Sequence, residues 1–483
     1  MSKKALAQSQ ISPSLPLWGI GFIVIILQIL SQNHPFFWDS IQLGAKHGLW
    51  YYEQQFSSFW LPASIDSGHP PFFGMYLAAG WFMFGKNLLV AHWLMFPFLL
   101  LLFYNAWRLG QDFLENQKAW LFPLFLLLDP GIAAQLFIVG PDLALLAFFT
   151  LTLRGVLSHR PQLILFGIIG LGMISMRGMM CGFALCLYDL IFNREGQRFS
   201  IKMIWNKLAP YLPGAFLMIA FLVAHYLHAG WIGYHQDSPW AGSFQVVGIK
   251  DIGRQALVLV WRLLDFGRIG LWIIMLYLVI RNRGQLAKEK WKPLLWIGGL
   301  LFLLLAWPFL RYIGVNQHRY LLPFILITYL FFLQLWKELS NHIQKTLLLA
   351  SLGICLLLGN LWVYPETISQ GWDSSLLHWK YHSQLKEAES FLQEQQIPFN
   401  QVGTAFPAIG AQKNRYLNEI EDGFKAYDFG KDRLILYANV MNDFSDEEIA
   451  QLQNTWTPIF KSEKLGVKVI IYSNEEVKTG RTQ

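Results

Sequence analysis

Long apolar runs separated by short basic loops dominate the chain up to about residue 365. The first run, residues 15–30, is just long enough to cross a bilayer as an α-helix, and further apolar runs recur to residue 363. Lysine and arginine cluster in the loops between the runs, as at residues 281–283 and 288–292. Because such clusters mark the cytoplasmic side of a membrane, the pattern predicts an α-helical transmembrane bundle of about eleven spans.

The same charges indicate how the chain threads the membrane. Lys3 and Lys4 precede the first run and place the N-terminus in the cytoplasm, before an uncleaved first helix. The short run 71–84 begins with two prolines. If it crossed, Arg108 and Lys118 would lie outside, so we expect an interfacial or re-entrant helix there. The outer loop before it is aromatic and amphipathic, which predicts helices lying beside the membrane.

Two later apolar runs, residues 163–176 and 179–192, are near the lower length limit for crossing a bilayer. We expect a pair of abbreviated helices joined at Arg177 and Gly178, with the joint below the outer surface. With these assignments every basic loop falls on one side. The prediction is therefore an integral multi-pass protein of the cell (inner) membrane.

Beyond Pro365 the composition becomes that of a soluble domain. We therefore expect two units, a transmembrane unit at residues 1–365 and a soluble unit at residues 366–483, which the topology places in the periplasm or otherwise outside the cytoplasm. Ser445 and Glu448 have the spacing of a capping box that opens a helix. The pattern predicts a small α/β or α+β domain with a helix at 379–395 and strands at 401–406, 433–440 and 467–472.

Composition supports the membrane assignment and excludes other classes. The chain is 54% hydrophobic with a mean hydropathy of +0.35, and 14% of its residues are charged, against about 25% in soluble domains. A net charge of +7 could suit nucleic acid, but the basic residues lie in short loops between apolar runs, so we expect no nucleic-acid partner. The cysteines lie inside apolar runs, which argues against disulfides and Cys-based zinc sites: Cys181, Cys186 and Cys355.

A metal site built from histidines is the less favoured interpretation. His225, His228, His235 and Asp237 have a spacing that could bind zinc. Lone histidines near a membrane surface usually have milder roles, such as hydrogen bonding to a carbonyl group. We therefore expect neither a metal nor another cofactor.

Polar residues that could carry chemistry gather on the outer side. Asp39 follows the first span, at a level where anchoring alone would need only Trp, Tyr or Lys. A carboxylate can accept a proton from a hydroxyl nucleophile, and guanidinium groups bind phosphate. The predicted outer set supplies both kinds of group: Asp39, Asp66, His69, Asp142, Arg177, Arg311, His318, Arg319 and Tyr320.

Four features occur in a fixed order: the first-loop acid Asp39, Gly-His-Pro-Pro at 68–71, Gly-Pro-Asp-Leu-Ala at 140–144 and His-Arg-Tyr-Leu-Leu-Pro at 318–323. In this order the chain resembles the GT-C glycosyltransferases, in particular the branch that contains protein O-mannosyltransferases and the lipid A aminoarabinose transferase. The resemblance covers about residues 15–335. Many relatives have a second acid directly after the first, whereas Ser40 follows Asp39 here, which leaves the acceptor class open.

The resemblance implies an enzyme that moves a hexosyl or pentosyl group from a polyprenyl-phosphate donor to a protein, lipid or glycan outside the cytoplasm, with inversion. Asp39 would be the catalytic base, and Asp142 would lie near the site. Because phosphate leaves without a strong general acid, this chemistry requires no metal. The predicted substrate-binding residues are His69, Arg177, His318, Arg319 and Tyr320.

Simpler roles and other function classes stay open. Asp39 and Asp142 could cap helices, and Arg177 could serve only to pair with an acid. Arg268 and Arg311 are better explained by snorkelling at helix ends than by ligand binding. The alternative class is a membrane transporter or a lipid or glycan flippase, which predicts charged or broken helices near the bilayer midplane in two related halves. A scaffold for envelope polysaccharide is a third possibility.

Overall fold

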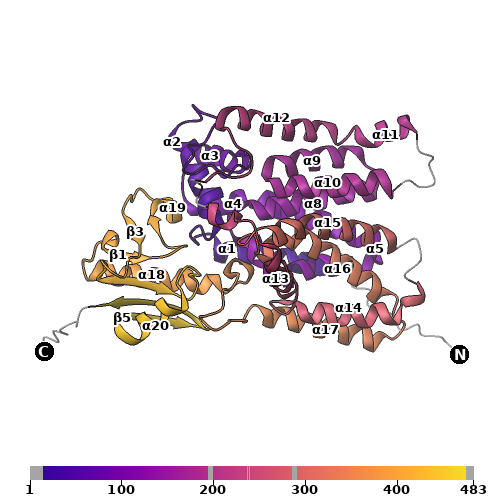
Figure 1. Cartoon of the computed structure of the whole chain (residues 1–483). Helices are drawn as coiled ribbons and strands as arrows, with labels where there is room; N and C mark the ends of the chain where they lie inside the picture. The colour runs from indigo at the N-terminus through magenta and orange to yellow at the C-terminus, as the bar shows by residue number, and fades with distance from the viewer. Residues whose placement is uncertain (1–14, 194–199, 237, 239, 286–290, 475–483) are drawn as a thin grey trace.

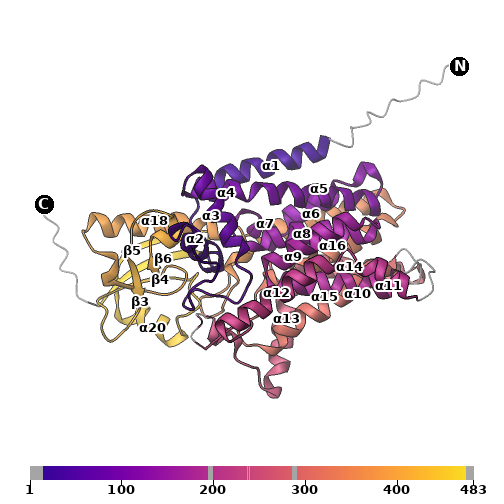
Figure 2. The ribbon, with the colours of Figure 1, turned by 90° about the horizontal axis from the view of Figure 1, so that it is seen from above.

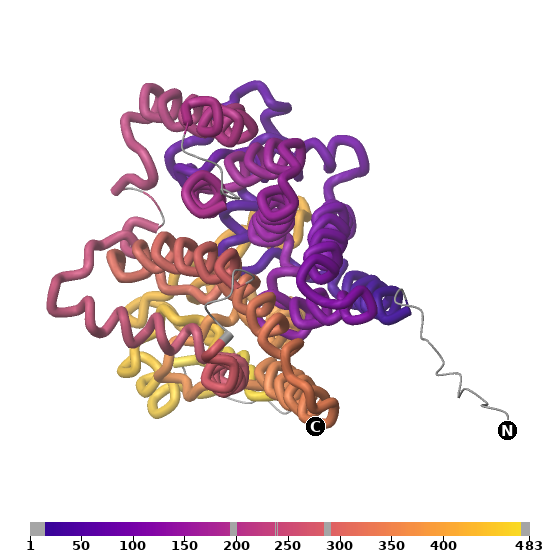
Figure 3. The backbone as a smooth tube through the Cα atoms, turned by 90° about the vertical axis from the view of Figure 1, so that its right-hand side faces the viewer, coloured from indigo at the N-terminus to yellow at the C-terminus, as the bar shows by residue number. Residues whose placement is uncertain are grey.

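The computed structural model describes residues 15–193, 200–236, 238, 240–285 and 291–474. A bundle of helices carries a mixed α/β unit at one end (Figure 1), and a view along the bundle shows many of its helices end-on (Figure 3). The bundle helices are α1 (Leu15–Ser31), α4 (Leu88–Leu94), α5 (Phe96–Phe113), α6 (Leu121–Leu128), α7 (Pro130–Phe137), α8 (Pro141–Leu157), α9 (Pro161–Ile174), α10 (Met176–Ile191), α11 (Ile201–Leu208), α12 (Leu212–Ala229), α13 (Ile252–Leu264), α14 (Arg268–Arg281), α15 (Lys292–Arg311), α16 (Leu322–Lys337) and α17 (His342–Gly359).

The predicted multi-span membrane bundle is confirmed. Within the described ranges, five helical stretches are long and apolar enough to cross a membrane, or seven if each of two sharply bent helix pairs is one span. Shorter apolar helices such as α1 and α9 join them in the bundle. The count of about eleven crossings stays a prediction, since it includes these short helices.

The predicted outer-loop helices are present. A π-helix, η1 (Ile41–Lys46), leads into α2 (His47–Glu53), and α3 (Phe72–Phe84) follows after an irregular stretch. Figures 1 and 2 place α2 and α3 at the end of the bundle nearest the sheet. With 13 residues, α3 is about 20 Å long, shorter than the roughly 30 Å hydrocarbon core, which agrees with an interfacial helix.

The abbreviated helices α9 and α10 are present, but the joint is not where we expected it. The break falls at Ser175, whose hydroxyl caps α10 by accepting a hydrogen bond from the Gly178 amide, at 3.1 Å. Arg177 is therefore in the first turn of α10 rather than in the joint. The reason is that serine in extended backbone supplies a cap, which Arg-Gly cannot.

The two bent helix pairs are tied together by a buried ion pair. The α6–α7 pair bends by 77° at Asp129 and the α13–α14 pair by 89° just before Arg268. Arg268 donates to both carboxylate oxygens of Asp129, at 2.6 and 2.7 Å, and Tyr329 donates to the same carboxylate at 2.8 Å. The snorkelling predicted for Arg268 is wrong, because its partner lies far away in the sequence and the pair is fully buried.

The C-terminal unit contains the predicted mixed α/β fold. Its helices are α18 (His378–Glu394), α19 (Lys413–Tyr416) and α20 (Asp446–Thr455), and the Ser445–Glu448 capping box is present. The sheet has the order β2-β3-β1-β4-β6-β5, in which β3, β1 and β4 are parallel and the other pairings antiparallel. Three strands were predicted, and three were missed; the six are β1 (Val402–Thr404), β2 (Gly410–Ala411), β3 (Gly423–Ala426), β4 (Leu434–Ala438), β5 (Thr457–Lys464) and β6 (Val467–Ser473).

One hydrophobic core joins this unit to the bundle. Phe37 and Trp38 of the first outer loop and Ile138 after α7 are buried together with residues of α18 and the sheet. The Phe37 ring stacks on His378 with ring centroids 5.2 Å apart. The backbone before Asp39 is thus clamped between bundle and sheet, which fixes where that carboxylate lies.

Candidate active site

Five short segments place charged side chains around one point between the bundle and the sheet. Asp39 precedes η1, Asp142 is in the first turn of α8, and Arg177 is in the first turn of α10. Arg319 belongs to a 3₁₀ turn, η7 (His318–Leu321), and Asp373 to another, η8 (Trp372–Ser374). All five residues lie at helix starts or in turns, at the end of the bundle next to the sheet.

The guanidinium of Arg319 is the centre of this cluster. It forms ion pairs with Asp39 and, at 2.5 Å, with Asp373, and its Nε lies 3.9 Å from Asp142. Only 4% of the Arg319 side chain is exposed, so water cannot solvate this charge. Three carboxylates therefore hold one buried cation in place.

Arg177 extends the cluster towards the bundle. It forms an ion pair with Asp142 at 2.6 Å and donates to the backbone carbonyl of Arg319 at 3.0 Å. The Tyr320 ring lies under both guanidinium groups, with its centroid 4.8 Å from Arg177 Cζ and 5.2 Å from Arg319 Cζ. The acid that pairs with Arg177 is thus Asp142, and both arginines contact the same aromatic ring.

Two cavities open from this cluster. The first, which we call the inner cavity, has a volume of about 340 Å³. Besides the charged cluster, its walls include apolar side chains of the bundle and of the loop after α12, among them Met176, Met180, Ile232, Leu305, Pro308 and Tyr312. The inner cavity therefore combines a charged end with an apolar arm.

The second, the outer cavity, has a volume of about 420 Å³ and lies towards the sheet. The residues that it shares with the inner cavity include Asp39, Arg319 and Tyr320, and it adds Phe406 and Asp443 from the segments after β1 and β4. Asp39 and Arg319 thus stand where the two cavities meet.

Exposure separates the three acids. The Asp39 side chain is 23% exposed, whereas that of Asp142 is 8% and that of Asp373 is 1% exposed. Burial raises the pKa of Asp373, although the charge of Arg319 opposes this shift. Asp39 is consequently the most exposed of the three, and it is the one of them that lines both cavities.

His69 lines both cavities, as its place among the predicted binding residues requires. Burial lowers its pKa to about 4, and the charge of Arg177 adds to this effect, so the ring is neutral at physiological pH. Its Nδ1 has no hydrogen-bond partner among the residues that the structure describes. A neutral imidazole with a free nitrogen can bind a hydroxyl group.

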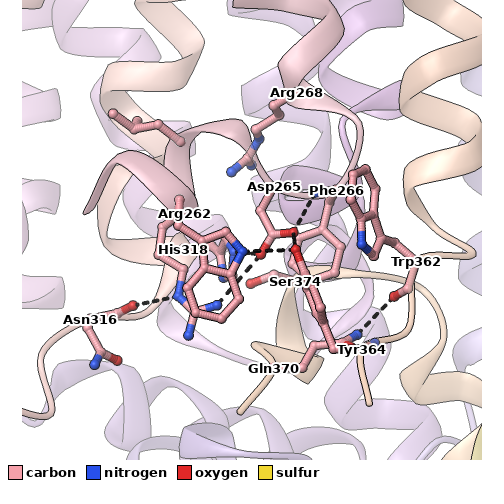
Figure 4. A network of polar contacts seen from close by, with 12 residues as sticks. Arg262, Asp265, Phe266, Arg268, Asn316, His318, Trp362, Tyr364, Gln370 and Ser374 are labelled. Carbon is pink, nitrogen blue, oxygen red and sulfur yellow. Dashed lines mark hydrogen bonds and ion pairs between the residues drawn. The ribbon is translucent and has the colours of Figure 1, made fainter. Parts of the chain in front are cut away.

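His318 lies behind the cluster and outside the walls of both cavities. Its Nε2 is 2.8 Å from Asp265, which also accepts a hydrogen bond from Tyr364 at 2.7 Å and lies 3.6 Å from Arg262 (Figure 4). This network fixes the turn that carries Arg319. A direct contact of His318 with substrate stays a prediction.

Sequence reasoning missed Asp373. This acid lies beyond the last apolar run, in the part of the chain that we assigned to the soluble unit. No motif surrounds it, and only its position shortly after the last span could have drawn attention to it. In the fold, Gln135 donates to the Asp373 backbone carbonyl at 2.8 Å and fixes η8 against α7.

The histidines considered for zinc have other partners. His225 contacts Asp66 through Nε2 at 2.9 Å and the Trp231 carbonyl through Nδ1 at 3.0 Å. Asp237 lies outside the described residues. Across the described part of the chain, no group of three or more His, Cys, Asp or Glu side chains is arranged to hold a metal ion.

Comparisons with known proteins find solved structures that share this fold. The chain matches the crystal structure of ArnT from Cupriavidus metallidurans bound to undecaprenyl phosphate with a TM-score of 0.55 and 10% sequence identity, over 96% of this chain and 99% of that one. The apo structure of the same protein matches with a TM-score of 0.51 and 11% identity, over 95% and 98%. No protein-family model and no curated protein sequence matches. The fold suggested by the motifs over about residues 15–335 is therefore confirmed, and the likeness to this ArnT extends it to nearly the whole chain, the C-terminal sheet unit included.

Proposed function

We propose that this protein is an integral-membrane glycosyltransferase that moves a sugar from a polyprenyl-phosphate donor to an acceptor outside the cytoplasm. One observation carries the proposal: Asp39, the most exposed acid of the cluster, pairs with Arg319 at the junction of an apolar and a polar cavity, and Arg177 lines the apolar one. The matched ArnT structure holds undecaprenyl phosphate, which supports the donor class.

The inner cavity suits a lipid phosphate. Its apolar arm would hold the first isoprene units, and Arg177 and Arg319 would bind the phosphate oxygens. The first turns of α8 and α10 also line this cavity, and the positive ends of their helix dipoles favour an anion. The phosphate would replace Asp39 on Arg319, which leaves the carboxylate free to act as a base.

The reaction then needs one base. The acceptor hydroxyl oxygen attacks the anomeric carbon of the donor sugar, and the bond from that carbon to the phosphate oxygen breaks. Asp39 accepts the hydroxyl proton, and polyprenyl phosphate leaves with the arginines neutralising its charge. A single displacement inverts the anomeric configuration, unlike the two-carboxylate chemistry of retaining hydrolases.

The charge distribution supports an outward-facing site. Arg281 and Lys292 flank the loop between α14 and α15, at the end of the bundle opposite the sheet (Figure 1). If these basic ends lie in the cytoplasm, Asp39 and the C-terminal unit lie in the periplasm or outside the cell. This agrees with a lipid-linked sugar donor, because such a donor supplies sugar outside the cytoplasm without a nucleotide sugar.

The test is to supply donors directly. Purified protein in lipid nanodiscs is incubated with a panel of undecaprenyl-phosphate hexoses and pentoses and with candidate acceptors of each class, an oligosaccharide, a glycolipid and a Ser/Thr-rich peptide, and mass spectrometry follows the release of undecaprenyl phosphate. We expect release from at least one donor by the wild type and release at least about a hundredfold slower by Asp39→Asn. An Asp428→Asn variant, changed at an exposed acid of the sheet unit, is the matched control and should behave as the wild type. Release by none of the donors, or equal release by Asp39→Asn, contradicts the proposal.

A further inference from the structure

The outer cavity has the position expected of an acceptor site. In the sheet, β1 lies between β3 and β4. The chain passes from β1 to β3 on one side of it and later returns to β4 on its other side. In open sheets of this kind, ligands bind at the carboxyl ends of the strands where the strand order changes direction. Phe406 and Asp443, which follow β1 and β4, both line the outer cavity. The cavity also reaches Asp39, the proposed base. Its volume of about 420 Å³ falls within the roughly 300–1,000 Å³ of small-molecule sites.

The charges of this cavity disfavour an anionic acceptor. Among the described residues that line it, Arg319 is the one cation, and Asp39 and Asp373 already neutralise it. The lining acids are Asp39 and Asp443. A phosphorylated acceptor would meet two carboxylates without a free guanidinium or ammonium group, and such like-charge contacts are costly.

The uncharged lining suits a polyhydroxyl ligand. Gln42 Oε1, Gln317 Oε1 and His69 Nδ1 all belong to residues that line the outer cavity, and each is a buried polar atom without a partner in the described chain. The amide and imidazole side chains in this lining can exchange hydrogen bonds with a ligand that carries hydroxyl groups. Sugar hydroxyls both donate and accept hydrogen bonds, as amide and imidazole groups require.

Aromatic side chains complete the lining. Trp240 lines the outer cavity alone, and Tyr234 and Phe244 line both cavities, with their rings stacked at a centroid distance of 4.6 Å and an angle of 7° between the planes. Flat aromatic faces pack against the apolar C–H faces of sugar rings, while planar amides bind their edges. Aromatic rings beside amide and carboxylate groups fit a saccharide better than an extended peptide, which would require exposed backbone groups.

We infer that the outer cavity binds a neutral saccharide, so that the acceptor is a sugar hydroxyl and the product a glycosidic bond between two sugars. This inference rests on the proposed function and names its acceptor class. The attacking oxygen belongs to the bound saccharide, its proton passes to Asp39, and the donor sugar is released from phosphate onto that oxygen.

Saturation-transfer NMR tests the inference on the full-length protein in nanodiscs containing undecaprenyl phosphate. The probes are neutral trisaccharides of glucose, mannose and N-acetylglucosamine, with mannose 6-phosphate and a Ser/Thr-rich peptide as competing classes. We expect at least one neutral saccharide to bind, and Trp240→Ala to weaken that binding by about fivefold. Trp205→Ala, changed at an exposed tryptophan of α11, is the control and should bind as the wild type.

A second measurement separates this inference from the proposed function. Native mass spectrometry of the same samples reports bound undecaprenyl phosphate. Retained lipid with no saccharide binding, or with preferred binding of mannose 6-phosphate or of the peptide, overturns the acceptor assignment alone. Loss of the lipid from the wild type argues against the proposed function instead. Saccharide binding that Trp240→Ala leaves unchanged also overturns the inference, because the ligand would then lie elsewhere.

Discussion

Replacing Asp39 by Asn separates the two roles proposed for this carboxylate. As the base, Asp39 accepts the acceptor proton; before the donor binds, it occupies Arg319, where the donor phosphate must go. The amide cannot accept the proton, so kcat should fall by about 10²–10⁴-fold. It also competes less well for Arg319, so undecaprenyl phosphate should bind more tightly than to the wild type.

The size of the expected gain in lipid affinity follows from the ion pair between Asp39 and Arg319. A hydrogen bond between charged groups contributes roughly 1.5–3 kcal/mol, and partial exposure of Asp39 reduces this to ~1–2 kcal/mol. Relief of that competition corresponds to about 5–30-fold tighter lipid binding. Folding should change little, since Asp373 still pairs with Arg319.

Single-turnover transfer with a labelled donor measures the first effect, and titration of undecaprenyl phosphate into nanodiscs measures the second. Asp373→Asn serves as a comparison, because this acid contacts the same guanidinium but is 1% exposed and cannot reach an acceptor. Transfer by Asp39→Asn within tenfold of the wild type would refute the role as base. Weaker lipid binding by Asp39→Asn would refute the competition for Arg319.

Three further outcomes are expected. Arg268→Ala should lower the free energy of unfolding by about 3–5 kcal/mol, because it leaves the buried Asp129 carboxylate unpaired. The double variant Asp129→Leu/Arg268→Met should recover most of that loss in thermal unfolding. Equal melting temperatures for the wild type and Arg268→Ala would contradict this. Burial lowers the pKa of His34 to about 4 and that of His378 to about 3, so the unfolded chain binds more protons below pH 6.5, and the stability of the contact between α18 and the first outer loop should fall from pH 6.5 towards pH 4. Hydrogen exchange of α18 measures this loss, and protection that does not change with pH would contradict it. Gln42→Lys should add a cation to the outer cavity and allow mannose 6-phosphate to bind, which isothermal titration measures; unchanged rejection of that sugar phosphate would show that charge does not set the acceptor class.

The candidate site was partly predictable from the sequence. Asp39, Asp142 and Arg319 belong to motifs on the predicted outer side and Arg177 to the predicted helix joint, and the fold brings all four into one cluster. Asp373 could not be predicted in the same way. It carries no motif, and it reaches Arg319 because η8 packs against α7 at the interface of the bundle and the C-terminal unit.

Hydrophobic periodicity and loop charge determined the membrane bundle, the change to a mixed α/β unit and most of the predicted secondary structure, because these depend on residues close together in the chain. Only the tertiary structure decided which acid each buried arginine holds. Asp129 meets Arg268, and Asp39 meets Arg319, across long stretches of chain. The tertiary structure also decided that two cavities meet at Asp39. The physical reason is that burying a charge requires a partner, and packing in three dimensions selects that partner without regard to sequence distance.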